Sequence, residues 1–155
     1  MCQGVSILLS RIAEETIERY RLNSRIISRG GECKELHFMH TERQRALPVY
    51  HAGQLVICEW GNGNTRAKLP RSGWCAAESL DSGKWRWLEP EPIEIPADFG
   101  FEKGVWYQIT QGIRGILVRD EQDKPHVYML TTPASHYYQI MTRCSRMPVL
   151  IEQDI

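Results

Sequence analysis

The chain has 155 residues, a length that fits one domain spanning residues 1–155. Nineteen basic residues balance nineteen acidic ones, so no global field draws the protein onto nucleic acid or anionic lipid. Any nucleic-acid contact must therefore come from a local patch. No apolar run approaches the roughly 18 residues of a membrane span, and the apolar stretch 5–9 lacks the basic leader of a signal peptide.

The number and spacing of the cysteines indicate the cellular compartment of the protein. There are five of them, an odd number at irregular spacing, and no export signal precedes them. Disulfide frameworks use even, regularly spaced sets in secreted chains, so we expect reduced thiols in a cytoplasmic protein. The five are Cys2, Cys33, Cys58, Cys75 and Cys144.

The first half of the chain predicts one helix followed by a hairpin. Ser10 is a candidate N-cap for a helix over residues 11–21, whose apolar side chains lean to one side. Two β-rich runs, 47–51 and 54–60, follow with a turn at Gly53 between them, a pattern typical of a β-hairpin.

The second half predicts strands, one more helix and a last strand. The clearest strands cover residues 105–110, 113–118 and 126–131, with a polar loop at 120–125. Pro133 suits the first turn of a short helix that reaches about residue 142, and residues 147–151 form a final strand. We therefore expect an α+β fold: a mainly antiparallel β-sheet or barrel-like core with a few short helices.

Two clusters invite a ligand interpretation. Cys33, His37 and His40 offer only three donors at a spacing that matches neither usual paired zinc motif, so we expect no metal site and no cofactor. The other cluster has cations near aromatic rings, a combination that suits single-stranded nucleic acid because bases stack on rings while phosphates meet cations. Its members are Trp60, Arg66, Lys68, Arg71 and Trp74, and a solvated basic loop beside core tryptophans is an equal alternative.

The N-terminus offers a reactive pair of groups. Initiator methionine is usually trimmed before a small residue, which would leave Cys2 with a free α-amine beside its thiol. The amine can condense with an aldehyde, and the thiol can then close a thiazolidine ring. With a pKa of about 7.7, roughly a third of such an amine is free base at pH ~7.4. The pair alone is a weak signal.

Six short elements, in order along the chain, resemble the SOS-response-associated peptidase family. The quoted segments are Met1-Cys2-Gln3-Gly4, Trp60-Gly61, Trp74-Cys75-Ala76-Ala77-Glu78-Ser79, Pro96-Ala97-Asp98-Phe99-Gly100-Phe101-Glu102, Leu130-Thr131-Thr132-Pro133-Ala134 and Cys144-Ser145-Arg146-Met147-Pro148-Val149. The chain resembles a short, divergent, phage-type member that lacks the family's C-terminal extension.

The resemblance implies a function in the DNA damage response. Family members remove their own Met1, bind single-stranded DNA and form a thiazolidine crosslink with the aldehyde of an abasic site. The resemblance assigns Cys2 as the nucleophile and Glu102 as the acid/base group, because a carboxylate can hold or donate a proton. Arg143 and Arg146 flank Cys144 as a second small basic cluster, so Arg146 is also a candidate DNA-binding residue.

Three family positions hold different residues here. Cys144 stands at the family histidine, Trp74 at the asparagine and Ala76 at the phosphate-binding arginine. A catalytically degenerate nucleic-acid-binding module without crosslinking is therefore the alternative function. A thiol protease that uses Cys2 or Cys144 is the weakest interpretation, since no histidine is placed beside either thiol.

Overall fold

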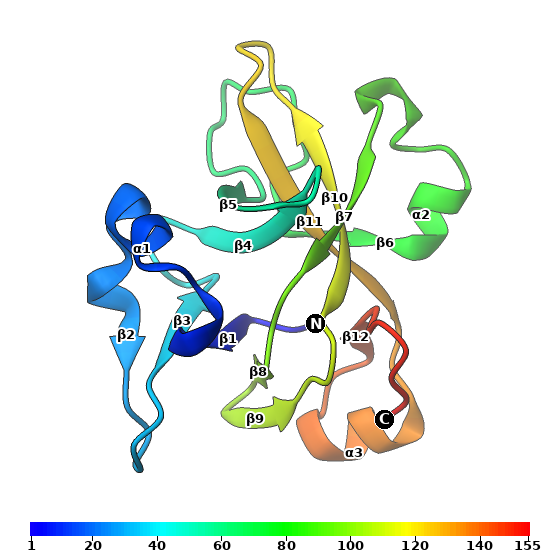
Figure 1. Ribbon diagram of the computed structural model, residues 1–155. Coiled ribbons are helices and arrows are strands. Elements are labelled where there is room, and N and C mark those ends of the chain that lie inside the picture. Colours follow the sequence, from blue (N-terminus) through cyan, green and yellow to red (C-terminus); the bar gives the residue numbers. More distant parts are fainter.

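Two β-sheets form the framework of the computed structural model, which describes residues 1–155 (Figure 1). Most strand pairs are antiparallel, and three α-helices are short, so the predicted α+β class is confirmed. In the larger sheet β10 also pairs with β11, which closes the strand order β10-β7-β4-β5-β11 into a ring. This ring is the barrel-like core that the strand pattern predicted.

The smaller sheet contains the chain's beginning. Its order is β2-β3-β1-β8-β9, so the first strand lies in the middle. The strands are β1 (Gly4–Leu8), β2 (Ile26–Ile27), β3 (Glu35–Met39), β8 (Phe99–Glu102) and β9 (Val105–Gln108). Every pair in it is antiparallel.

The larger sheet confirms the predicted hairpins. Its strands are β4 (Ala46–His51), β5 (Gln54–Trp60), β6 (Trp74–Ala76), β7 (Glu91–Ile95), β10 (Ile113–Arg119), β11 (Pro125–Pro133) and β12 (Arg146–Pro148). The β4–β5 turn is Ala52-Gly53, and both residues have positive φ, as a two-residue turn between twisted strands requires. β11 pairs in parallel with β5 and β6.

The helices begin later than the sequence predicted. They are α1 (Glu14–Tyr20), α2 (Ala77–Asp81) and α3 (His136–Thr142), and three 3₁₀ turns cover Leu9–Arg11, Leu22–Arg25 and Arg86–Leu88. Ser10 caps nothing, because it lies inside the first 3₁₀ turn. Pro133 is the last residue of β11, and the N-cap of α3 is Ser135, whose hydroxyl accepts from the Tyr138 N–H. The last predicted strand shrinks to β12 and a bridge at Leu150.

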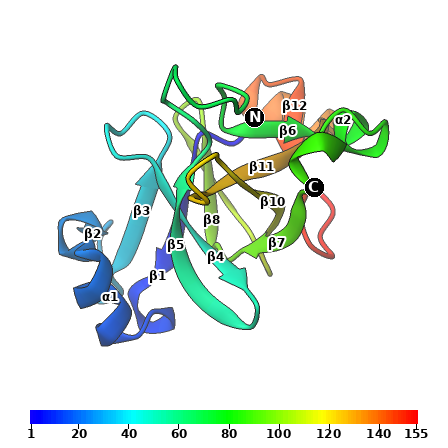
Figure 2. The same ribbon diagram turned by 90° about the horizontal axis from the view of Figure 1, so that it is seen from above.

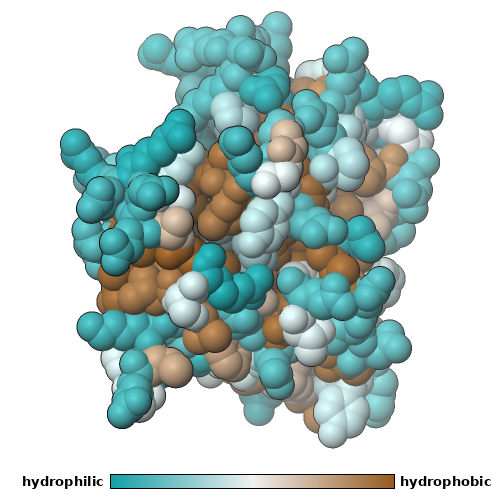
Figure 3. Space-filling model, in the orientation of Figure 1, coloured by the Kyte–Doolittle hydropathy of each residue, from teal (hydrophilic) through white to brown (hydrophobic).

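The main core is shared by both sheets, α3 and the first residues of the chain. It joins 23 buried residues, among them Cys2, Trp60, Tyr107 and Tyr138. Hydrophilic side chains cover most of the face in Figure 3, with apolar side chains visible between them. None of the helices has the length and apolar character needed to cross a membrane.

Candidate active site

The N-terminus is held against the edge of the core instead of extending into solvent. In Figure 1 and Figure 2 it lies beside β12. The Met1 α-ammonium donates to Cys144 Sγ at 2.8 Å and to the Arg146 carbonyl at 2.9 Å. Its nitrogen is 3.7 Å from Glu102 Oε2. Chain ends are usually poorly ordered unless they are tied down, so these contacts make the terminus a structural element.

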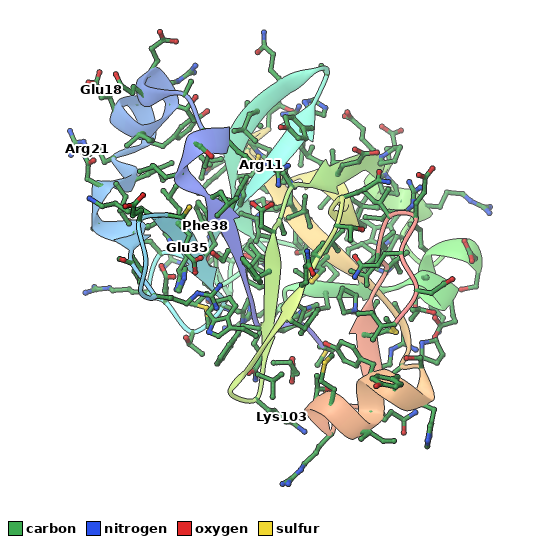
Figure 4. The ribbon with its side chains drawn as sticks, turned by 60° about the horizontal axis from the view of Figure 1, so that its bottom comes forward. Arg11, Glu18, Arg21, Glu35, Phe38 and Lys103 are labelled. Carbon is green, nitrogen blue, oxygen red and sulfur yellow. The ribbon has the colours of Figure 1, made fainter.

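Glu102 reaches this point because of its place in a hairpin. It ends β8, and Lys103 and Gly104, both with positive φ, turn the chain back into β9. The carboxylate is 2 % exposed, and its Oε2 has no hydrogen-bond partner. A buried charge without full partnering is costly, which makes this oxygen a candidate for chemistry. Lys103, at the tip of this hairpin, donates to the Arg143 carbonyl at 2.9 Å instead of pairing with Glu102 (Figure 4).

Cys144 comes from the opposite side of the site, directly after α3. Arg143 ends the helix in the left-handed conformation, and the Cys144 N–H donates to Thr142 Oγ1 at 3.2 Å. The half-buried thiol then lies 3.4 Å from Glu102 Oε1, toward which its S–H donates. The sequence predicted that Glu102 and Cys144 would share a site, and the structure brings them together at the N-terminus.

Cys2 lies beneath this cluster and is fully buried. Its Sγ donates to the Gly4 carbonyl at 2.9 Å. Burial raises the pKa of the Cys2 thiol, and the nearby Glu102 charge raises it further, against hydrogen bonds from Tyr107 and the backbone that lower it. While Met1 is attached, Cys2 is therefore a protonated core thiol that no substrate reaches.

Two tyrosines that the sequence analysis did not single out line the inner wall. Tyr107 and Tyr138 face each other edge to face, with their hydroxyl oxygens 3.1 Å apart. Burial raises the pKa of both hydroxyls, so they remain neutral. Gly100 makes room for this wall, since a Cβ there would come within 2.5 Å of the Tyr107 ring. Only the fold reveals the pair, because 31 positions separate the two residues.

Trp74 closes the site on the side of the larger sheet. Its Nε1 donates to the Cys2 carbonyl at 3.0 Å, so this ring holds the N-terminal segment instead of standing free for a base. His40 packs against it at a ring distance of 4.4 Å. Burial, with the charge of Arg45, lowers the pKa of His40 to about 4, so this imidazole is neutral.

Trp60, which we expected to contact DNA, is a core residue. It is 1 % exposed, and its Nε1 donates to the Gly73 carbonyl at 2.8 Å. Gly61 follows with φ +70, and a Cβ there would come within 2.0 Å of the Ser72 carbonyl. The tryptophan therefore anchors the loop 61–73 against the barrel and has no free face for stacking.

The side chain of Arg146 is also occupied by hydrogen bonds within the protein. Its guanidinium donates to both carboxylate oxygens of Glu78 at 2.7 and 3.2 Å, and to Thr131. This arginine lowers the pKa of Glu78, its ion-pair partner. A phosphate would have to displace Glu78, so the structure gives Arg146 a positioning role: its carbonyl holds the Met1 amine.

The remaining predicted cations are exposed. Arg66, Lys68 and Arg71 stand on the loop between β5 and β6, and none of their side chains makes an ion pair. The loop begins at the groove described next and ends at Trp74, beside the N-terminus. It therefore spans the distance between these two sites.

A groove of ≈ 1040 Å³ lies between the α1–β2 segment and β3–β5, and no local sequence pattern predicted it. Its basic side chains are Arg21, Arg25, Arg43, Arg45 and Lys124. Arg25 and Lys124 are paired with groove carboxylates, whereas Arg21 and Arg43 have no acidic partner. The cations are scattered over about a hundred positions, so only the fold could collect them.

The cluster Cys33, His37 and His40 is dispersed. Cys33 is exposed, while the His37 ring nitrogen lies 2.6 Å from Glu35 and packs on Trp106. No group of three or more potential metal ligands converges anywhere in residues 1–155. No protein-family model matches the chain, and no curated protein matches it in sequence. The family resemblance thus stays a prediction carried by six short elements.

Proposed function

We propose that the protein binds single-stranded DNA and captures abasic sites covalently through Cys2 after Met1 is removed. The freed α-amine condenses with the sugar aldehyde, losing water to form an imine. The thiol then adds across the C=N bond, its sulfur binding the carbon and its proton ending on nitrogen. The product is a thiazolidine, and no oxidant, metal or cofactor takes part.

The observation that carries this proposal is the position of the N-terminus beside a buried, incompletely paired carboxylate. Glu102 Oε2 lies 3.7 Å from the present α-amine, and the amine that replaces it is one residue further along the chain. Condensation needs a group that takes a proton from the ammonium and returns one to the departing hydroxyl. Glu102 supplies that group at the correct end of the chain.

The DNA part of the proposal depends on the exposed cations. The groove with Arg21 and Arg43, and the loop with Arg66, Lys68 and Arg71, form one basic path toward Trp74. A strand lying on it would bring its sugars toward the N-terminus. Reduced thiols are required throughout, which fits the cytoplasm.

Because Cys2 is buried while Met1 is attached, we propose that removal of Met1 switches on the reaction. Met1 holds the segment closed through its contacts with Cys144 and Arg146. Removal of Met1 eliminates these contacts and creates the amine, so only the processed chain crosslinks through Cys2. We propose that the protein removes this residue itself, as the family resemblance implies.

An adduct assay tests the proposal. The processed protein, verified by intact mass, is incubated with a single-stranded oligonucleotide that carries one abasic site and is then run on a denaturing gel. We expect a stable adduct that Cys2→Ser abolishes and Cys33→Ser retains, since Cys33 is the exposed thiol. An intact oligonucleotide should give no adduct. Absence of any Cys2-dependent product contradicts covalent capture.

Non-covalent binding is the second candidate, and the full burial of Cys2 favours it. A degenerate module would keep the basic path and use Cys2 as a core residue. It predicts salt-dependent binding of single strands, without a covalent product from the processed chain. The same gel, combined with a binding titration, separates the two candidates.

A further inference from the structure

We propose that the chain that retains Met1 has its own aldehyde-trapping pair, formed by the Met1 α-amine and the Cys144 thiol. In this form Cys2 is buried, but the amine and the second thiol meet at the surface end of the site. The ligand class is an aldehyde, either on an abasic sugar or as a free small molecule. The product is an N,S-acetal that bridges residues 1 and 144.

The geometry of the two reacting atoms carries the inference. The α-nitrogen and Cys144 Sγ are 2.8 Å apart, although 143 positions separate them in the chain. A nitrogen and a sulfur bonded to one tetrahedral carbon lie about this far apart. One carbon can therefore bridge them without movement of the backbone. Such preorganisation replaces a bimolecular encounter and accelerates ring closure.

A second, independent observation is the carboxylate aimed at the pair. Glu102 is 2 % exposed, with Oε1 3.4 Å from the thiol and the unpartnered Oε2 3.7 Å from the amine. Each oxygen thus faces one of the two groups that must lose a proton. The amine and its residue are partly exposed, which gives an aldehyde access.

The reaction is balanced without an added reagent. Glu102 takes a proton from the α-ammonium, and the free amine attacks the aldehyde carbon to give a carbinolamine. Return of the proton to its hydroxyl expels water and leaves a protonated imine. The Cys144 sulfur then bonds to the imine carbon, and the thiol proton passes to the Glu102 carboxylate.

This inference rests on the proposed function in one respect, that aldehydes reach the Glu102 site. It differs in the nucleophile, and it gives the cysteine at the family histidine position a chemical role. The unprocessed chain would then trap aldehydes reversibly, because its product is a large ring instead of the five-membered thiazolidine.

A Cys2→Val variant is the first reagent for the test. Valine is close to cysteine in size and cannot form a thiazolidine, and expression with methionine aminopeptidase inhibited keeps Met1 on the variant, as intact mass verifies. The protein is treated with glycolaldehyde or, separately, with an abasic single-stranded oligonucleotide, and is digested at mild pH for peptide mapping by mass spectrometry. Wild-type protein expressed with methionine aminopeptidase inhibited replaces the variant if the variant does not fold.

We expect the N-terminal peptide linked to the peptide containing Cys144, and loss of this link when Cys144→Ala is added. Cys33→Ala should retain it. A link with glycolaldehyde alone identifies free aldehydes as the ligand, and a link with both probes includes the abasic sugar. No link from folded, Met1-retaining protein with either probe, or a link that survives Cys144→Ala, overturns the inference. Failure of the Cys2 adduct leaves this result unaffected, so the two proposals fail separately.

Discussion

Glu102 stands where the fold tolerates a carboxylate only at a cost. Its carboxylate is buried near the neutral Tyr138, and one carboxylate oxygen faces the α-amine without forming a hydrogen bond. Stability alone would favour an uncharged residue at this position. A costly carboxylate between an amine and a thiol is better explained by proton transfer.

Glu102→Gln should slow adduct formation about 100-fold, the lower end of what general acid–base catalysis contributes. Glutamine keeps the size and the Cys144 contact but cannot exchange protons. The measurement is the rate of adduct formation by the processed protein on abasic single-stranded DNA. Glu94→Gln, on the exposed face of β7, is the matched control and should not change the rate. Equal rates for the two variants would remove Glu102 from the mechanism.

The pair of His126 and Asp120 contributes to the acid dependence of the fold's stability. The His126 ring is 2 % exposed, with Nε2 2.9 Å from Asp120 Oδ2 and Nδ1 2.8 Å from the Gly61 carbonyl. The hydrogen bond from His126, helped by the backbone N–H groups of Lys124 and Gln122, lowers the pKa of Asp120 against partial desolvation. The folded state therefore releases this proton more readily than the unfolded chain does.

Asp120→Asn should lower the unfolding free energy by about 1.5 kcal/mol at pH 7, the size of a charge-assisted hydrogen bond. A lowered folded pKa stabilises the fold above the unfolded value of about 3.9, and this gain disappears as pH falls through the folded pKa. Urea unfolding of the wild type and the variant, from pH 7 down into acid, should thus show a stability difference that narrows once the pH falls below the unfolded pKa. Asp123→Asn should give no such stability difference, because the Asp123 side chain is 85 % exposed. A stability difference that is constant with pH would contradict this assignment.

At the scale of elements, α3 controls the position of Cys144. The helix has seven residues and one side-chain cap, the Ser135 hydroxyl on the Tyr138 N–H at 3.1 Å. Short helices depend on such caps, because four N–H groups at the helix start lack intrahelical partners. The far end of α3 delivers Cys144 to Glu102, so the cap also stabilises the site.

Ser135→Ala should cost about 1 kcal/mol of unfolding free energy, the usual value of an N-cap. Ser145→Ala is its control, since the exposed Ser145 uses only its backbone carbonyl, to hold the Ala134 N–H. Denaturant unfolding measures both variants. A loss of equal size at Ser145 would show that the effect is not capping.

Strands with strong local patterns were predictable, and those defined by distant partners were not. The β4–β5 and β10–β11 hairpins consist of β-rich runs joined by turn signals, and their prediction is confirmed. β1 and β8 are five and four residues long, and they pair with each other across more than ninety positions, although each also has a nearer partner, β3 and β9 respectively. No local window contains that information.

At the scale of the whole molecule, binding to DNA must follow local charge, because the net charge is zero. Replacing Arg66, Lys68 and Arg71 with serine should weaken binding of a single strand. It should also reduce the slope of log K against log salt by about 2, since each phosphate contact contributes about 0.7. Fluorescence anisotropy across a salt series measures this slope. Arg114→Ser, exposed on β10, should change neither quantity, and an equal loss there would contradict a localised path.

The sequence predicted individual residues of the site, but it did not predict the groups of residues that the fold assembles there. Cys2, Glu102 and Cys144 were named from short elements, and the structure brings Glu102 and Cys144 to the N-terminus. Trp60 and Arg146 were assigned to DNA because sequence does not distinguish an exposed ring or free guanidinium from an internally bonded one. The basic groove and the tyrosine wall were missed because their members are far apart in the chain.

The central position of β1 in the smaller sheet has a consequence for synthesis. On one side β1 pairs with β3, and on the other with β8, whose last residue is Glu102. A protein is synthesised from its N-terminus, so β1 has no β8 strand to pair with until about two thirds of the chain has been made. The amine-binding groups arrive later still, at residues 144 and 146. Throughout that interval the Met1 amine lacks the partners that hold it in the folded protein.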